Sequence, residues 1–129
     1  MNFKEYTEKA MSTRLESCEN SSYMLLNLVG EVGEFAGKIA KAIRKKDLMI
    51  EGNRLIPRYI DADELFGLNE QLKLEAGDIM WQLFGLIDTL GWDAEEIANM
   101  NLQKLAARKK ENTIIGSGDG VTKEERKEK

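Results

Sequence analysis

Apolar residues recur at helical spacing along most of the chain. In the segment 23–45 they lie three or four positions apart, which is the period of one face of an α-helix. These positions are Leu25, Leu28, Val29, Val32, Ala36, Ile39 and Ile43. The segment 69–90 is apolar on nearly all sides of a helix, which predicts a helix buried on most sides. With shorter helices at 2–11 and 93–109, the pattern predicts an all-α helical bundle.

Polar residues suited to capping stand at the ends of these segments. Asn20 begins an Asn-Ser-Ser run just before the first long helix, where such residues cap a helix N-terminus. Gly91 follows the second long helix and is a typical C-terminal stop. Asp93, with Glu96 three residues later, resembles a capping box and predicts the start of the last helix.

Residues 47–67, between the two long helices, break the helical pattern. Two short apolar stretches flank Gly52 and Asn53, so a small hairpin with a Gly-Asn turn is one expectation. A mobile loop is the alternative. Pro57 excludes one continuous helix across this insertion.

The length of 129 residues predicts one domain, which we place at 1–112, followed by a C-terminal tail at 113–129. The tail contains GSGDG and KEERKEK and is expected to be partly disordered. No apolar run reaches the roughly 18 residues of a membrane span, and the N-terminus lacks the apolar core of a signal peptide. Together with the lone Cys18, this predicts a cytoplasmic protein.

Charge and histidine content exclude several classes of function. The net charge of −4 gives no global positive field, which disfavours binding to nucleic acid or to acidic membranes. The chain contains no histidine. It therefore cannot build Ser-His or Cys-His nucleophilic systems or a His-ligated zinc site.

Carboxylates occupy a polar face on each long helix. The polar face of the first helix is formed by Asn27, Glu31, Glu34, Lys38 and Lys41. Glu31 and Glu34 are one turn apart and can reach one ion, although a solvated polar face would look the same. On the second helix, Glu75 and Asp78 stand in a narrow slot between apolar groups. Acids on a largely buried helix need a partner.

Antiparallel packing of the two helices would bring the four acids to one point. Four clustered carboxylates repel one another unless a cation joins them, and hard oxygen ligands favour Mg²⁺, with Mn²⁺ as a substitute. Lys38 and Lys41 offer a different solution, since they could neutralise the cluster by salt bridges. The pattern alone leaves both solutions open.

A basic stripe lies on the last predicted helix. Asn101, Lys104 and Arg108 stand at positions i, i+3 and i+7 and therefore share one face. Taken alone, such a stripe is most simply an exposed charged face. Beside an acidic metal site, however, its cations and amide suit phosphate oxygens.

The acidic pairs carry a resemblance to a known family. Glu31-Val-Gly-Glu34 and Glu75-Ala-Gly-Asp78, with similar flanks, resemble the E-x-x-E and E-x-x-D motifs of the MazG-like all-α nucleoside triphosphate pyrophosphohydrolases. The likeness covers 1–110 apart from the insertion. It implies a helical bundle that forms a homodimer or homotetramer and uses Mg²⁺. The implied reaction is hydrolysis of a nucleoside triphosphate, between its α and β phosphorus atoms, to the monophosphate and pyrophosphate.

By motif position, the resemblance assigns roles to individual residues. Four metal ligands carry over, which are Glu31, Glu34, Glu75 and Asp78. Of these, Glu34 is the first candidate for orienting or deprotonating the attacking water, and Glu31 is the second. The resemblance also implies phosphate contacts at Lys104 and Arg108, with Asn101 beside them. Lys41 and Asn27, on the polar face of the first long helix, are further candidates for substrate binding.

Other functions stay open at this point. The chain could be a related phosphoribosyl-ATP or dUTP pyrophosphohydrolase, or a non-catalytic helical interaction module whose acids and lysines pair with one another. The gap between the two motifs, residues 35–74, is longer than in typical members of the family. The base and sugar of the substrate are therefore not predicted.

Overall fold

The fold was analysed in a computed structural model that describes residues 1–58 and 60–112. The elements in chain order are α1 (Phe3–Met11), the 3₁₀ turn η1 (Glu16–Cys18), α2 (Ser21–Arg44), β1 (Leu48–Glu51), β2 (Arg54–Pro57), α3 (Ala62–Thr89) and α4 (Ala94–Lys110). The prediction of an all-α fold is confirmed, with one small hairpin as its sheet within the described residues. The predicted tail at 113–129 lies outside the described residues.

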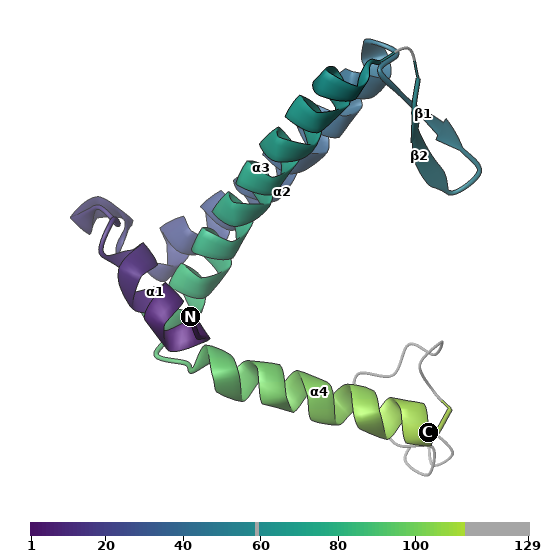
Figure 1. Cartoon of the computed structure of the whole chain (residues 1–129). Coiled ribbons are helices and arrows are strands. Elements are labelled where there is room, and N and C mark those ends of the chain that lie inside the picture. The colour runs from purple at the N-terminus through teal and green to yellow at the C-terminus, as the bar shows by residue number, and fades with distance from the viewer. Residues whose placement is uncertain (59, 113–129) are drawn as a thin grey trace.

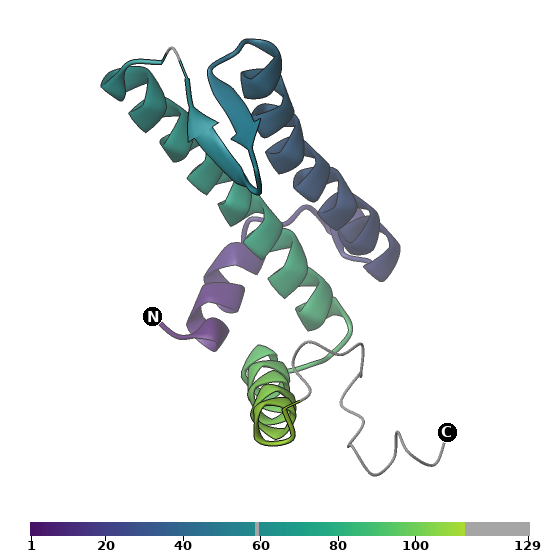
Figure 2. The same ribbon diagram turned by 90° about the vertical axis from the view of Figure 1, so that its right-hand side faces the viewer.

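Two long helices form the body of the molecule. Figures 1 and 2 show α2 and α3 side by side and antiparallel, joined through the hairpin at one end. At the other end, α1 packs against α3, and α4 leaves from the same end and runs away from the pair (Figure 1). No helix in the described part of the chain has the length and apolar character needed to cross a membrane.

Side-chain caps define the helix starts that the sequence predicted. The side chain of Asn20 accepts the backbone N–H of Tyr23 at the start of α2. Asp93 accepts two backbone N–H groups at the start of α4. Each bond satisfies a donor that has no partner within the helix, which is why these helices begin where they do.

The start of α3 differs from the prediction. The helix begins at Ala62 rather than at 69, because the side chain of Asp61 accepts the backbone N–H of Glu64 and caps an earlier first turn. Asp63 and Glu64 lie in this first turn, where the helix dipole favours acids. The second half of the predicted insertion is therefore helical.

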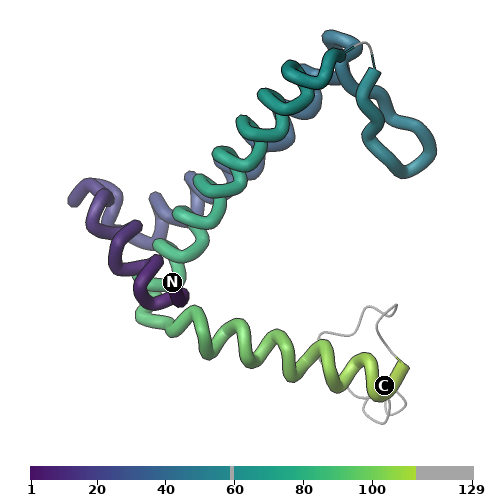
Figure 3. The backbone as a smooth tube through the Cα atoms, viewed as in Figure 1, coloured from purple at the N-terminus to yellow at the C-terminus, as the bar shows by residue number. Residues whose placement is uncertain are grey.

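The first half of the insertion is the hairpin rather than the mobile loop. β1 and β2 are antiparallel, and their register runs from Leu48 opposite Pro57 to Glu51 opposite Arg54. The turn needs Gly52, whose φ of 62° lies in the left-handed region. The hairpin projects from the end of the helix pair (Figures 1 and 3). Leu48 is buried and fixes its base beside α2.

Hydrogen bonds and close packing attach α1 to the end of α3. The indole N–H of Trp81 donates to the carbonyl oxygen of Ala10 and to the hydroxyl of Thr13, at 3.0 and 3.1 Å. The missing side chain of Gly85 leaves room for Met24, which is fully buried. A Cβ at Gly85 would overlap the methyl group of Met24. A larger side chain at position 85 would therefore disturb the packing at this end of the pair.

Most of the apolar surface of the two long helices is exposed in the single chain. The prediction that α3 is buried on most sides is wrong for this chain by itself, because α2 covers one side and α1 only one end. Leu74 of α3 is 70% exposed. The apolar face of α2, which we define as Leu25, Val29 and Val32, is about half exposed or more. The other elements of the single chain therefore do not cover the apolar surface of these two helices.

Candidate functional site

The four predicted acids meet where α2 and α3 run side by side. Carboxylate oxygens of Glu31, Glu34 and Glu75 lie within 4.8 Å of one another. Asp78 is close enough for its charge to raise the pKa of the Glu31 carboxyl. The structure thus brings three of the acids together and places the fourth beside them. We call these four residues the acid cluster.

The orientation of α2 explains why its acids point inward. The side of α2 that meets α3 lies at the border between its polar and apolar faces. Met24 and Ala42, at the two ends of that side, are the buried residues of the helix, and Glu31 lies between them. Turning this border toward α3 carries the acids to the interface and leaves the apolar face outside.

Mutual repulsion marks the acid cluster. The pKa of the Glu31 carboxyl is raised above its ordinary value, first by burial and then by the charges of Glu34 and Asp78. The side-chain amide of Asn27 donates to Oε1 of Glu31 at 3.3 Å and partly opposes this increase. Such a shift is what clustered carboxylates show when no cation separates them.

Tyr6 of α1 also approaches the cluster. The pKa of its hydroxyl is raised by burial and by the charge of Asp78. Its ring packs edge-on against Phe84, with centroids 5.2 Å apart. Tyr6 is not among the predicted site residues, because nothing in the sequence pattern of α1 indicates which of its residues reaches α3.

One lysine balances part of the charge. Nζ of Lys38 lies 3.2 Å from Oε1 of Glu75, whose side chain is only 14% exposed. Lys41 forms no ion pair within the described residues, so the salt-bridge alternative holds for one of the two lysines. One ammonium group against four carboxylates leaves the acid cluster strongly negative.

The donor set of the acid cluster fits a divalent cation. Oε2 of Glu75 is buried and has no hydrogen-bond partner. A buried carboxylate oxygen in that state is costly, and a cation would satisfy it. Several carboxylate oxygens at one point are the ligands that hard ions such as Mg²⁺ prefer. Glu31, Glu34, Glu75 and Asp78 are the residues that would hold such an ion.

The predicted contacts on α4 are placed elsewhere. Asn101 and Lys104 border a shallow depression together with Ile97 and Met100 of the same helix. Because α4 runs away from the α2–α3 pair (Figure 1), the single chain does not bring these residues or Arg108 to the acid cluster. Their contact with phosphate stays a prediction.

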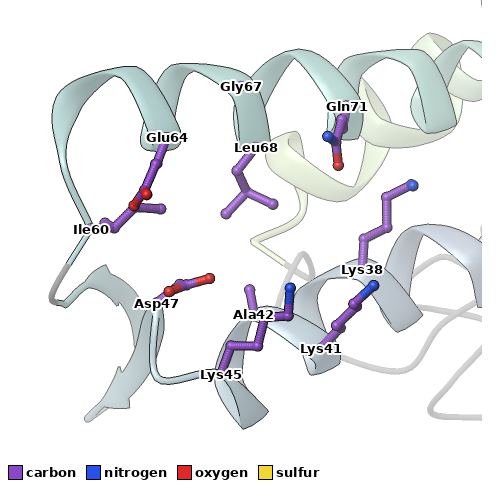
Figure 4. A pocket seen from close by; sticks show the side chains of 10 residues that line it. All are labelled: Lys38, Lys41, Ala42, Lys45, Asp47, Ile60, Glu64, Gly67, Leu68 and Gln71. Atoms are coloured by element: carbon purple, nitrogen blue, oxygen red, sulfur yellow. The ribbon is translucent and has the colours of Figure 1, made fainter.

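A cavity of about 790 Å³ opens next to the acid cluster. It lies between the C-terminal part of α2, the start of α3 and the base of the hairpin, and Figure 4 shows side chains of the two helices facing each other across it. We call it the lysine pocket, after Lys38, Lys41 and Lys45 on its α2 wall. Lys45 and Gln71, which also line it, were not among the predicted site residues.

Comparison with known proteins identifies the family of the chain. The sequence profile of the MazG nucleotide pyrophosphohydrolase domain matches residues 19–113, which include α2, the hairpin, α3 and α4. The Gene 37 protein of Mycobacterium phage L5 is 36% identical over 105 residues, which cover 81% of this chain and 79% of that protein. No solved structure matches the chain. The chain belongs to the MazG nucleotide pyrophosphohydrolase family.

Proposed function

We propose that the chain is a Mg²⁺-dependent nucleoside triphosphate pyrophosphohydrolase that releases a nucleoside monophosphate and pyrophosphate. The observation that carries this proposal is the meeting of Glu31, Glu34 and Glu75 within 4.8 Å at the α2–α3 interface, with Asp78 beside them. The family match supports the reaction class. Mn²⁺ is expected to substitute, because its oxygen ligands are of the same kind.

The residues of the chain divide the work between binding and proton transfer. A divalent ion in the acid cluster would supply positive charge at the phosphate oxygens and make water acidic enough to attack near neutral pH. Glu34 is exposed and belongs to the acid cluster, so its carboxylate can orient the attacking water and accept its proton. Glu31, held by Asn27, is the second candidate for this role. No covalent bond to the protein is required.

A second copy of the chain completes the proposed assembly. Exposed apolar residues are grouped on α2 and α3. On an ordinary monomer surface, by contrast, such residues are scattered singly. A twofold axis would bury the same face on both copies at once, as in most homodimers. Such a dimer, or a tetramer built from it, could also bring α4 of one copy to the acid cluster of its partner.

Direct measurement of pyrophosphate release tests the proposed reaction. The assay should cover canonical and damaged ribo- and deoxyribonucleoside triphosphates, with phosphoribosyl-ATP and dUTP included, in Mg²⁺ and in EDTA. The proposal expects release in Mg²⁺ and none in EDTA. Strong preference for phosphoribosyl-ATP or dUTP would instead favour one of the related enzymes. No turnover of any nucleotide would favour a non-catalytic interaction module.

Substitutions in the acid cluster make the test specific. Glu34→Ala and Asp78→Ala should each lower kcat by about 100-fold or more, which is the usual effect of losing a general base or a metal ligand. Glu70→Ala is the matched control, because Glu70 lies on α3 but pairs with Lys73 at the surface. Full activity in Glu34→Ala or Asp78→Ala, with unchanged helicity, would contradict these roles.

A further inference from the structure

The lysine pocket continues directly from the acid cluster. Lys38 borders the pocket and also pairs with Glu75, so the two features share a side chain. The pocket volume of about 790 Å³ lies within the range of about 300–1,000 Å³ typical of small-molecule sites. A molecule held at the acid cluster therefore has room to extend toward the hairpin.

The α2 wall of the pocket is a row of cations. Lys38, Lys41 and Lys45 stand at positions i, i+3 and i+7, so their side chains leave the same side of the helix. The row covers about 10 Å along the helix axis. Neither Lys41 nor Lys45 has an ion-pair partner within the described residues. The helix thus presents ammonium groups without a protein anion bound to them.

The opposite wall does not cancel this charge near the acid cluster. Gln71 and Leu68 of α3 face the part of the pocket closest to the cluster and carry no charge (Figure 4). Asp47 and Glu64, the acids of the pocket, lie at its far end beside the hairpin and the start of α3 (Figure 4). The acids of the pocket and its uncharged α3 residues therefore lie at different ends, and no acid of the pocket wall faces Lys41 from Leu68 or Gln71.

We call the line between α2 and α3 that holds the acid cluster and the lysine pocket the α2–α3 groove. On the other side of the acid cluster, this groove carries neutral amide side chains instead of lysines. Asn27 lies one turn before Glu31 on α2, and Gln82 lies one turn after Asp78 on α3. Because the helices are antiparallel, both amides are on the side of the acid cluster away from the lysines (Figures 1 and 2). Gln82 is 3% exposed, and its Oε1 has no hydrogen-bond partner. The groove is thus cationic at one end and neutral and polar at the other.

We propose that the lysine pocket binds the terminal phosphates of the substrate, which leave as pyrophosphate. This inference rests on the proposed function, and it adds the direction in which the triphosphate lies: β and γ phosphates toward Lys41 and Lys45, nucleoside toward Asn27. Charge-assisted bonds from ammonium to phosphate are the strong kind, and each lysine supplies three donors. Lys38 now pairs with Glu75. If a divalent cation took over the charge of Glu75, the ammonium group of Lys38 would be available to bind phosphate as well.

The insertion builds this pocket. Asp47 and Ile60 flank the hairpin, and Glu64 and Leu68 belong to the early turns of α3 that the cap at Asp61 makes possible. A chain with a shorter connection between the two acidic motifs would lack this end of the groove. Residues of the insertion thus form part of the wall of the proposed phosphate end of the site.

Binding of inorganic pyrophosphate tests the proposal without turnover. Isothermal titration with the full chain in Mg²⁺ should use wild type, Lys41→Ala, Lys45→Ala and the charge-conserving Lys41→Arg. Lys73→Ala is the matched control, because this exposed lysine of α3 pairs with Glu70 outside the pocket. Lys38 is left unchanged, since its loss would also alter Glu75. The three substituted lysines are exposed, so each of the four variants should fold, which circular dichroism checks.

The proposal expects Lys41→Ala and Lys45→Ala to weaken pyrophosphate binding about tenfold or more, with Lys73→Ala at the wild-type value. Lys41→Arg should retain most of the affinity. Equal affinity in all variants, or no binding by wild type, would overturn the inference.

Parallel assays of nucleotide hydrolysis separate this result from the proposed function. If wild type hydrolyses nucleotides and the alanine variants still bind pyrophosphate normally, the subsite is wrong and the function stands. If no nucleotide is hydrolysed but the alanine variants lose affinity for pyrophosphate, the lysine pocket is a pyrophosphate site and the proposed function is wrong.

Discussion

At the scale of single residues, the acid cluster lowers the stability of the empty protein. Four carboxylates share one stretch of the α2–α3 interface, and Lys38 offsets only one of them. The raised pKa of Glu31 and the unpartnered Oε2 of Glu75 are two signs of this cost. Residues placed for ligand binding commonly lower the stability of the empty protein.

Removing one negative charge should reverse this effect in the empty protein. We expect Glu31→Gln to raise the melting temperature in EDTA, because a neutral amide costs less to bury than a carboxylate and also relieves repulsion from Glu34 and Asp78. The free energy of unfolding should rise by up to about 1 kcal/mol. In Mg²⁺ the order should change, since wild type gains stability by binding the ion and the variant loses a ligand. Thermal unfolding in both buffers measures this. A lower melting temperature for Glu31→Gln in EDTA would contradict the repulsion argument.

At the scale of elements, the sequence predicted which helices and strands exist better than it predicted where each of them begins and how it faces its neighbours. The helices, the hairpin and the caps at Asn20 and Asp93 follow from local patterns that each segment carries by itself. The start of α3 was missed because Gly67 and the polar residues after Asp61 were assigned to the insertion. The sequence does mark this helix start, because Asp61 can cap a helix and is followed by Asp63 and Glu64, which the helix dipole favours in a first turn.

The periodicity of apolar residues could not predict which side of α2 contacts α3. A helical wheel shows correctly that Glu31 and Glu34 lie away from Leu25 and Val29. Which side of α2 meets α3 depends on tertiary packing, including the contact of Met24 with Gly85. The convergence of the acids could therefore be predicted from the two motifs together, whereas the exposure of the apolar face and the lysine pocket could not.

The cap of α3 provides a test at this scale. Asp61→Ala should lower the unfolding free energy by about 1 kcal/mol, because the backbone N–H of Glu64 loses its acceptor. Asp63→Ala is the control: Asp63 is an exposed acid of the same first turn for which no side-chain hydrogen bond is found in the described part of the chain. Urea unfolding of both variants compares them. Equal effects would mean that the charge in the first turn, rather than the cap, sets the start of α3.

At the scale of the whole molecule, the exposed apolar face of α2 provides a test of the proposed homodimer. Val29 is 67% exposed, and an aspartate there should prevent a second copy from covering this face. We expect wild type to sediment as a dimer or larger and Val29→Asp to shift toward the monomer. Leu15→Asp is the control, because Leu15 is similarly exposed at 69% but lies outside the long helices. An unchanged assembly in Val29→Asp would place the contact elsewhere.

The unlike ends of the α2–α3 groove have a consequence for how the reaction products leave. If the proposed reaction and orientation hold, amides on one side of the acid cluster and lysines on the other would give the two products separate places, and they would not need to depart in a fixed order. A monophosphate and pyrophosphate should then be able to inhibit together rather than exclude each other. Kinetics with both inhibitors present would give intersecting lines in a double-inhibition plot, whereas a single shared place would give parallel ones.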